Sequence, residues 1–250
     1  MVEKILAYER DLFFMLNGSD SPFLDRFMWL FSGKAVWLPL AAFILIVLLY
    51  KKKWKESILI LLGIVLVVTL CDQFASVYSW ESAPCTVLVV TLCDQFASHV
   101  CKPIFTRFRP THHPDFMDQV KTVFDYRGGR YGFISSHAAN AFGFATYMSL
   151  LFRYRLFTWT IFLWAALTAY TRVYLGVHFI SDIVPGAIAG VFFGWLVYWL
   201  YVKVHPVVTG SDGKVSAIYS DSRKRIIVYA IFITTLLIAI FNVPLAGWLR

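Results

Sequence analysis

The chain has 250 residues, of which 59% are hydrophobic and only 15% are charged, and its mean hydropathy is +0.65. An ordinary soluble domain is about half apolar and about a quarter charged, so this composition argues against a soluble globule. It also excludes a disordered chain, a collagen and a disulfide scaffold. The formal net charge of +8 selects no partner by itself, because basic residues in short loops also orient membrane helices.

Residues 1–34 are predicted to form an N-terminal interfacial amphipathic segment. Apolar residues recur at helical spacing between residues 5 and 16, but acidic and basic residues alternate with them, so this stretch is too charged to cross a bilayer. The run of Asn, Gly, Ser, Asp and Pro at residues 17–22 is typical of a helix end.

Six apolar segments are candidates for membrane crossing, since about 20 apolar residues are needed to span a bilayer core of about 30 Å. The segments are residues 35–50, extended upstream by residues 27–33, and residues 57–76, 131–152, 156–171, 183–202 and 226–249. Lipid cannot hydrogen-bond an exposed backbone, so helices are expected. The predicted fold is therefore all-α, a polytopic membrane helical bundle of about six transmembrane helices, with residues 35–250 as one transmembrane catalytic domain.

Lys and Arg in alternate loops predict the orientation, because such residues are retained in the cytoplasm. Basic residues gather at residues 51–55, 153–155 and 203–225. These three loops are expected to be cytoplasmic. The loops at residues 77–130 and 171–182, together with both termini, are then extracytoplasmic.

A twelve-residue segment, residues 65–76, recurs letter for letter as residues 87–98. Repeat architectures need several diverged copies, so a recent duplication or an error in the sequence fits better. Residues 77–98 are interpreted as an insertion, placed as a re-entrant or peripheral piece. Their removal would join Ser76 to His99 and extend one helix into the basic motif that follows.

Three polar clusters fall on the predicted extracytoplasmic side. The first, residues 102–110, carries Lys102 and Arg109, cations suited to an anionic group, although alone it would more often anchor a lipid headgroup. In the second, the hydroxyls of Ser135 and Ser136 and the backbone N–H groups around His137 open a helix, whose positive end can bind an anion. A lone histidine there would more often be structural.

The third cluster contains Arg172, His178 and Asp182. His178 and Asp182 are four residues apart, so on a helix the carboxylate can hold one imidazole nitrogen while the other attacks. Alone they could be an ordinary ion pair. Together, however, the clusters supply three cations, two histidines and one carboxylate, which is the set that phosphoryl transfer needs.

These clusters resemble the three-part signature of the type 2 phosphatidic acid phosphatase (PAP2) superfamily, namely Lys-x6-Arg-Pro, Pro-Ser-Gly-His and Ser-Arg-x5-His-x3-Asp. Residues 102–110 match the first part in full. Residues 134–137 match the second with Ile and Ser in place of Pro and Gly, and residues 171–182 match the third with Thr in place of Ser.

The resemblance implies that His178 attacks phosphorus to form a phosphohistidine and that Asp182 orients His178. His137 is then expected to protonate the leaving alkoxide and afterwards to activate water. The groups implied to hold the phosphate oxygens are Lys102, Arg109, Ser135, Ser136 and Arg172.

The resemblance implies no metal and no other cofactor. The only metal-like cluster is the run His-His-Pro-Asp at residues 112–115, which lacks a third ligand and is interpreted as a loop at the mouth of the site. The four cysteines match no zinc or redox spacing.

A catalytic centre at the end of transmembrane helices implies a membrane lipid phosphate as substrate. The chain looks most like bacterial family members that act on lipid A phosphate or on undecaprenyl diphosphate, in the inner membrane with the site facing the periplasm. The basic loop at residues 111–130 is either a lid for an anionic headgroup or a solvated connector. A membrane phosphotransferase that uses the same histidines and a non-catalytic binder or transporter of anionic lipid remain alternatives. No nucleic-acid partner is expected, and the sequence does not indicate an oligomeric state.

Overall fold

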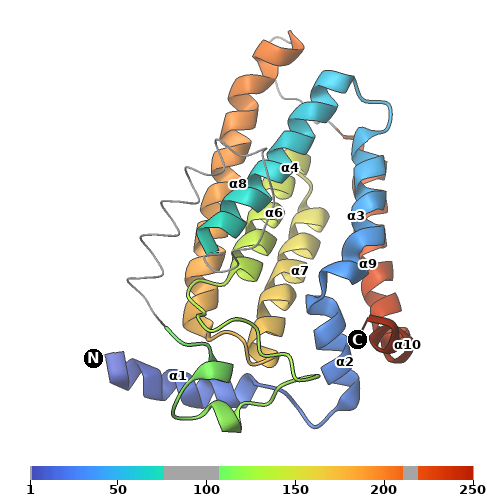
Figure 1. Cartoon of the computed structure of the whole chain (residues 1–250). Coiled ribbons are helices and arrows are strands. Elements are labelled where there is room, and N and C mark those ends of the chain that lie inside the picture. Colours follow the sequence, from blue (N-terminus) through green and yellow to red (C-terminus); the bar gives the residue numbers. More distant parts are fainter. Residues whose placement is uncertain (1, 76–106, 211–218, 250) are drawn as a thin grey trace, which may run out of the picture.

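A computed structural model of the chain describes residues 2–75, 107–210 and 219–249 (Figure 1). Its regular elements are helices, and two extended segments meet in one isolated β-bridge, between Phe108 and Tyr131. The all-α fold class is thus confirmed for the described residues. Lys102 and residues 77–98, the predicted insertion, lie outside them.

The helices follow one another along the chain with two short 3-10 turns, η1 and η2, in the long connection before α6. In order they are α1 (Val2–Leu16), α2 (Pro22–Ser32), α3 (Lys34–Leu49), α4 (Trp54–Ala75), η1 (Pro110–His112), η2 (Met117–Gln119), α6 (Ser136–Phe152), α7 (Arg155–Tyr174), α8 (Ile180–Thr209), α9 (Asp221–Ile240) and α10 (Asn242–Leu249).

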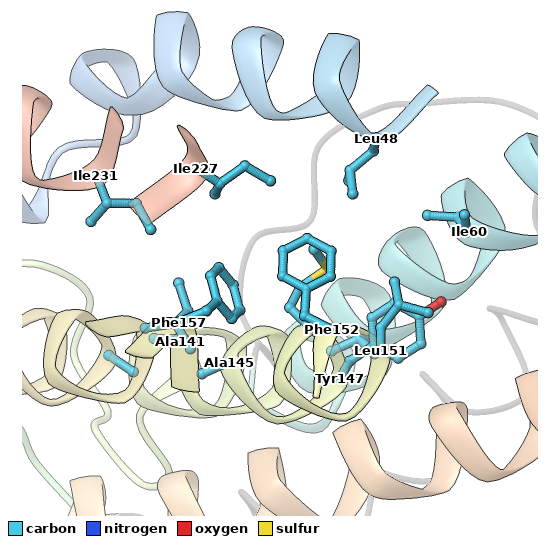
Figure 2. Close-up of a cluster of buried hydrophobic side chains, with 14 of the residues drawn as sticks. Leu48, Ile60, Ala141, Ala145, Tyr147, Leu151, Phe152, Phe157, Ile227 and Ile231 are labelled. Atoms are coloured by element: carbon cyan, nitrogen blue, oxygen red, sulfur yellow. The ribbon is translucent and has the colours of Figure 1, made fainter. Parts of the chain in front are cut away.

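Helix α6 lies at the centre of the bundle and packs against α4, α7 and α8. Its apolar side chains spread around the helix, as expected for a helix buried on most sides. Figure 2 shows the main core, in which α6 meets residues of α3, α4, α7 and α9. Its labelled members are Leu48, Ile60, Ala141, Ala145, Tyr147, Leu151, Phe152, Phe157, Ile227 and Ile231.

Three glycines of α8 allow it to approach the backbone of α6 closely. Gly186, Gly190 and Gly194 recur at four-residue spacing and so share one helix face. A Cβ on Gly190 would lie 2.3 Å from the carbonyl oxygen of Ala139, and one on Gly194 would lie 2.4 Å from that of Gly143. Small residues at such spacing are typical of helices that pack backbone to backbone. This contact fixes where α8 begins relative to where α6 begins.

The six predicted apolar segments are all largely helical, but their boundaries differ from the prediction in three places. Residues 27–33 belong to the separate helix α2, which Gly33 ends in an extended conformation, so that α2 and α3 meet at 53°. The last segment divides into α9 and α10, bent by 84°. Residues 131–135 are extended rather than helical, because Ser135 caps the start of α6.

Among the described helices, α8 alone is long and apolar enough to cross a membrane. If the bent pair α2–α3 and the bent pair α9–α10 each count as one span, the described helices give three spans. The count of about six transmembrane helices therefore stays a prediction.

The basic loops gather at one end of the bundle. Arg223 donates a hydrogen bond to the carbonyl oxygen of Tyr50 at 2.9 Å, and the Lys224 ammonium lies 5.8 Å from the centre of the Tyr154 ring. Helix α1 lies across the opposite end, near the beginning of α8 (Figure 1). The three clusters of basic residues and the predicted site thus lie at opposite ends, as the alternation of loops requires.

Candidate active site

The predicted catalytic residues meet at the end of the bundle where α6 and α8 begin and α7 ends. His137 lies in the first turn of α6, Arg172 in the last turn of α7 and Asp182 in the first turn of α8. His137 lies within electrostatic range of Arg172, of His178 and of Arg109. Arg109, which directly precedes η1, is brought into the same place.

His178 and Asp182 form a buried pair, with side chains 2% and 0% exposed. The Nδ1 atom of His178 lies 3.4 Å from Oδ2 of Asp182, and the backbone N–H of Phe179 donates to the same oxygen at 3.0 Å. An imidazole held at Nδ1 by a carboxylate reacts through Nε2. This geometry suits a nucleophilic histidine with an orienting carboxylate.

Ser135 connects the starts of α6 and α8. Its backbone N–H donates to the carbonyl oxygen of Asp182 at 3.0 Å, and its hydroxyl accepts from the N–H of Ala138 as the N-cap of α6. The hydroxyl of Ser135 is therefore used in capping and is fully buried. Ser136 and His137 follow it in the first turn of α6, where N–H groups and the helix dipole favour an anion.

A polar pocket of about 340 Å³ opens beside His137. Arg172 lines this pocket, and its guanidinium donates to the hydroxyl of Ser32 and, at 3.1 Å, to that of Tyr126. The Nε atom of Arg172 is buried and has no hydrogen-bond partner among the described residues. Lys34 also lines the pocket. A phosphate group matches this arrangement of donors.

Arg109 is held against the extended segment that precedes α6. Its Nε donates to the carbonyl oxygen of Tyr131 at 2.9 Å. Gly132 leaves room here, since a Cβ at this position would lie 2.9 Å from Oδ2 of Asp182 and 3.2 Å from Cγ of Arg109. Burial, followed by the positive charge of Arg172, lowers the pKa of Arg109. Two neighbouring guanidinium groups make the site favourable for an anion.

The His-His-Pro-Asp run lies on η1 and the turn after it. His113 stacks on the ring of Phe116, with ring centres 4.1 Å apart, and its Nδ1 lies 3.7 Å from the carboxylate of Asp115. Burial, followed by the charges of Arg109, Arg127 and Arg130, lowers the pKa of His112. Within the described ranges no three His, Cys, Asp or Glu side chains are grouped to hold a metal.

The basic loop after Arg109 is anchored to the fold at several points. The guanidinium of Arg130 lies over the ring of Phe108 at 5.2 Å, and the hydroxyl of Thr111 donates to the carbonyl oxygen of Arg127 at 2.7 Å. Residues 125–130 are exposed, so the lid and the solvated connector both stay predictions for this loop.

Sequence reasoning missed several residues that the structure brings to the site. Lys34, Ser32 and Tyr126 line or contact the polar pocket, yet none belongs to a motif. The sequence feature that could have indicated Lys34 is its position, a single cation next to Gly33 at the start of an apolar segment. Tyr126 carried no such signal, because a tyrosine in a basic loop is not distinctive.

Comparisons with known proteins give the following similarities. Residues 83–206 match the family model described as the PAP2 superfamily. The lipid A 4'-phosphatase of Porphyromonas gingivalis is 40% identical over 227 residues, which cover 90% of this chain and 87% of that protein. The lipid A 4'-phosphatase of Bacteroides thetaiotaomicron is 37% identical over 205 residues, covering 82% and 81%. The crystal structure of Aquifex aeolicus LpxE is 28% identical, with a TM-score of 0.49, and the match covers 75% of this chain and 92% of that one.

Proposed function

Because the chain belongs to the PAP2 superfamily and is a phosphatase, we propose that it removes a phosphate group from lipid A through a phosphohistidine intermediate. The observation that carries the proposal is the buried His178–Asp182 pair, together with a pocket that His137, Arg172 and Lys34 line. The identity to two lipid A 4'-phosphatases over most of the chain supports lipid A over undecaprenyl diphosphate.

In the proposed reaction, Nε2 of His178 attacks phosphorus while the bond to the lipid oxygen breaks. Asp182 keeps the imidazole oriented and stabilises its positive charge. His137 donates a proton to the leaving oxygen and then takes one from the water that cleaves the phosphohistidine, which releases inorganic phosphate. Arg109 and Arg172, together with Lys102, bind the phosphate oxygens as charge spreads over them.

A separate apolar crevice is lined by residues of α3 that follow Lys34, which supports a lipid substrate. Lys34 lines the polar pocket, and Trp37, three residues later on the same helix, lines a crevice of about 230 Å³. Every residue that lines this crevice is apolar, and Ile44 and Trp164 are among them. A phosphate bound at Lys34 would thus leave an acyl chain to lie along α3.

The decisive experiment measures phosphate release by the purified protein in the absence of any acceptor. The parent protein is expected to release phosphate from lipid A, and much less from undecaprenyl diphosphate or phosphatidylglycerol phosphate. The variant His178→Ala is expected to release no phosphate from any of them. Release that requires an added alcohol acceptor would identify a phosphotransferase. Tight binding of intact lipid A without release would identify a lipid binder.

Activity is expected to survive EDTA, because a histidine nucleophile and cationic side chains supply the chemistry without a metal. Vanadate is expected to inhibit, since it adopts the trigonal-bipyramidal shape of the transition state. Loss of activity with chelator, restored by zinc or magnesium, would contradict the mechanism.

We further propose that the protein lies in the bacterial inner membrane with its site facing the periplasm. The grouping of the basic loops at the end opposite the site supports this orientation. A single cysteine in residues 51–55, placed in a chain whose own four cysteines are replaced, should resist an impermeant thiol reagent in intact cells. One near Gly128 should react. The reverse pattern would place catalysis in the cytoplasm.

A further inference from the structure

Helix α1 reaches the catalytic segment through a glutamate that no motif includes. The side chain of Glu9 is only 10% exposed. Its Oε1 accepts the backbone N–H of Ser181 at 2.8 Å, and its Oε2 lies 2.5 Å from a terminal nitrogen of Arg107. Glu9 therefore contacts the residue next to Asp182 and the cation that faces Asp182.

Arg107 carries this contact to the catalytic carboxylate. Its other terminal nitrogen donates to Oδ1 of Asp182 at 3.2 Å and also to the hydroxyl of Ser181. The guanidinium carbon lies 4.5 Å from the centre of the Phe179 ring. The two oxygens of Asp182 thus have different partners, because Arg107 binds Oδ1 whereas Oδ2 faces His178.

The position of α1 is fixed at two further points. Phe13, fully buried, packs edge-on against Phe179 with ring centres 5.4 Å apart. At the end of α1, the Asn17 side chain donates to the carbonyl oxygen of Tyr174 at 2.9 Å. Because α1 is held on both sides of the His178 segment, Glu9 has a defined place relative to Asp182.

We propose that Glu9 is a positioning residue for the reaction proposed above, on which this inference rests: by pairing with Arg107 it keeps Oδ2 of Asp182 directed at His178. Without Glu9, Asp182 is the remaining acidic partner of Arg107 among the described residues. A guanidinium favours two-pronged binding of a carboxylate, so Arg107 then draws both oxygens of Asp182 to itself. His178 loses its orientation, while the phosphate pocket, which Glu9 does not line, is unchanged.

The test compares Glu9→Gln and Glu9→Ala with Asp11→Asn, a matched control on the exposed side of the same helix. Glu9→Gln keeps an oxygen for Ser181 but removes the charge. We expect both Glu9 variants to lower kcat by about tenfold or more, with KM within about twofold of the parent, because misplacing a catalytic group slows chemistry more than it weakens binding. Asp11→Asn should keep the parent values.

A second comparison separates positioning from general support of the fold. In an Arg107→Met background, Glu9→Gln should cause little further loss of kcat, because its effect passes through Arg107. Additive losses, a rise in KM with unchanged kcat, or equal behaviour of Glu9→Gln and Asp11→Asn would each overturn the inference while leaving the proposed function intact. Absence of phosphate release by the parent protein would instead overturn the proposed function and the inference with it.

Discussion

The two histidines of the site lie in different surroundings. His178 is buried against Asp182, whereas His137 is half-buried at the start of α6 and lines the polar pocket. One position suits a nucleophile that needs orientation, and the other suits a group that exchanges protons with the leaving oxygen and with water.

This difference predicts a dependence on the leaving group. His137→Ala should lower the hydrolysis of lipid A by about 10²- to 10⁴-fold, the usual contribution of a general acid. The loss on p-nitrophenyl phosphate should be much smaller, since its leaving group needs little protonation. His178→Ala should abolish both reactions. Equal losses on both substrates in His137→Ala would show that His137 is only structural.

Tyr126 predicts a pH dependence. Burial raises the pKa of Tyr126, but the charges of Arg172, Arg109 and Lys34 outweigh it, so that this pKa lies below its ordinary value of 10.0. As pH rises through this lowered pKa, the phenol becomes a phenolate that competes with phosphate for Arg172. In the parent, kcat/KM should therefore fall at alkaline pH earlier than it does in Tyr126→Phe.

Tyr126→Phe also serves as a structural control, because phenylalanine keeps the ring beneath Arg172. In the parent, the guanidinium carbon of Arg172 lies 5.5 Å from the centre of that ring. Near pH 7, Tyr126→Phe should lose about threefold to tenfold in kcat/KM, the effect of one hydrogen bond. Identical alkaline limbs in the two proteins would show that Tyr126 does not titrate in the site.

At the residue scale, the spacing of residues in the sequence was sufficient to predict which side chains meet when both belong to one motif. His178 and Asp182 do meet, although His178 lies two residues before α8 begins at Ile180, so the pair forms across the start of the helix and not within a full helical turn. Glu9 and Arg107 also meet, but they are far apart in the sequence, and only the packing of α1 against the rest of the fold joins them. A pattern within one segment contains no information about such a contact.

At the element scale, the contact between α6 and α8 sets the distance between His137, at the start of α6, and Asp182, at the start of α8. The glycine spacing of α8 was visible in the sequence, but its partner helix was not. The break at Gly33 and the bend between α9 and α10 were also hidden, because apolar composition continues through both. Hydropathy detects burial in apolar surroundings and does not detect the direction of the chain.

Gly190→Ala tests this contact. The added methyl group would lie 2.3 Å from a backbone oxygen of α6, so the helices must separate. We expect about 1–3 kcal/mol of destabilisation, measured by thermal or denaturant unfolding in detergent, and a lower kcat. Gly247→Ala is the matched control, because nothing lies within 4 Å of a Cβ there. Equal stability of the two variants would mean that α6 and α8 are not held by backbone contact.

At the scale of the whole molecule, the duplicated segment gives a prediction about domain organisation. Deleting residues 77–98 and deleting residues 65–86 give the same chain, because the two copies are identical. If the extra piece is an insertion in a single catalytic domain spanning residues 35–250, the shortened protein should keep or improve phosphate release and unfolding temperature. An inactive product that still enters the membrane would show that the extra piece supports the site.

The close contact of α6 with α8 also bears on how the enzyme responds to bilayers of different thickness. Helices adapt to a thicker or thinner hydrocarbon core by tilting. Two helices locked backbone to backbone tilt as one body, so His137 and the His178–Asp182 pair keep their separation. What changes is the depth of the pocket relative to the headgroups. Lipid acyl-chain length should thus alter how readily substrate reaches the pocket, through KM, while kcat stays constant.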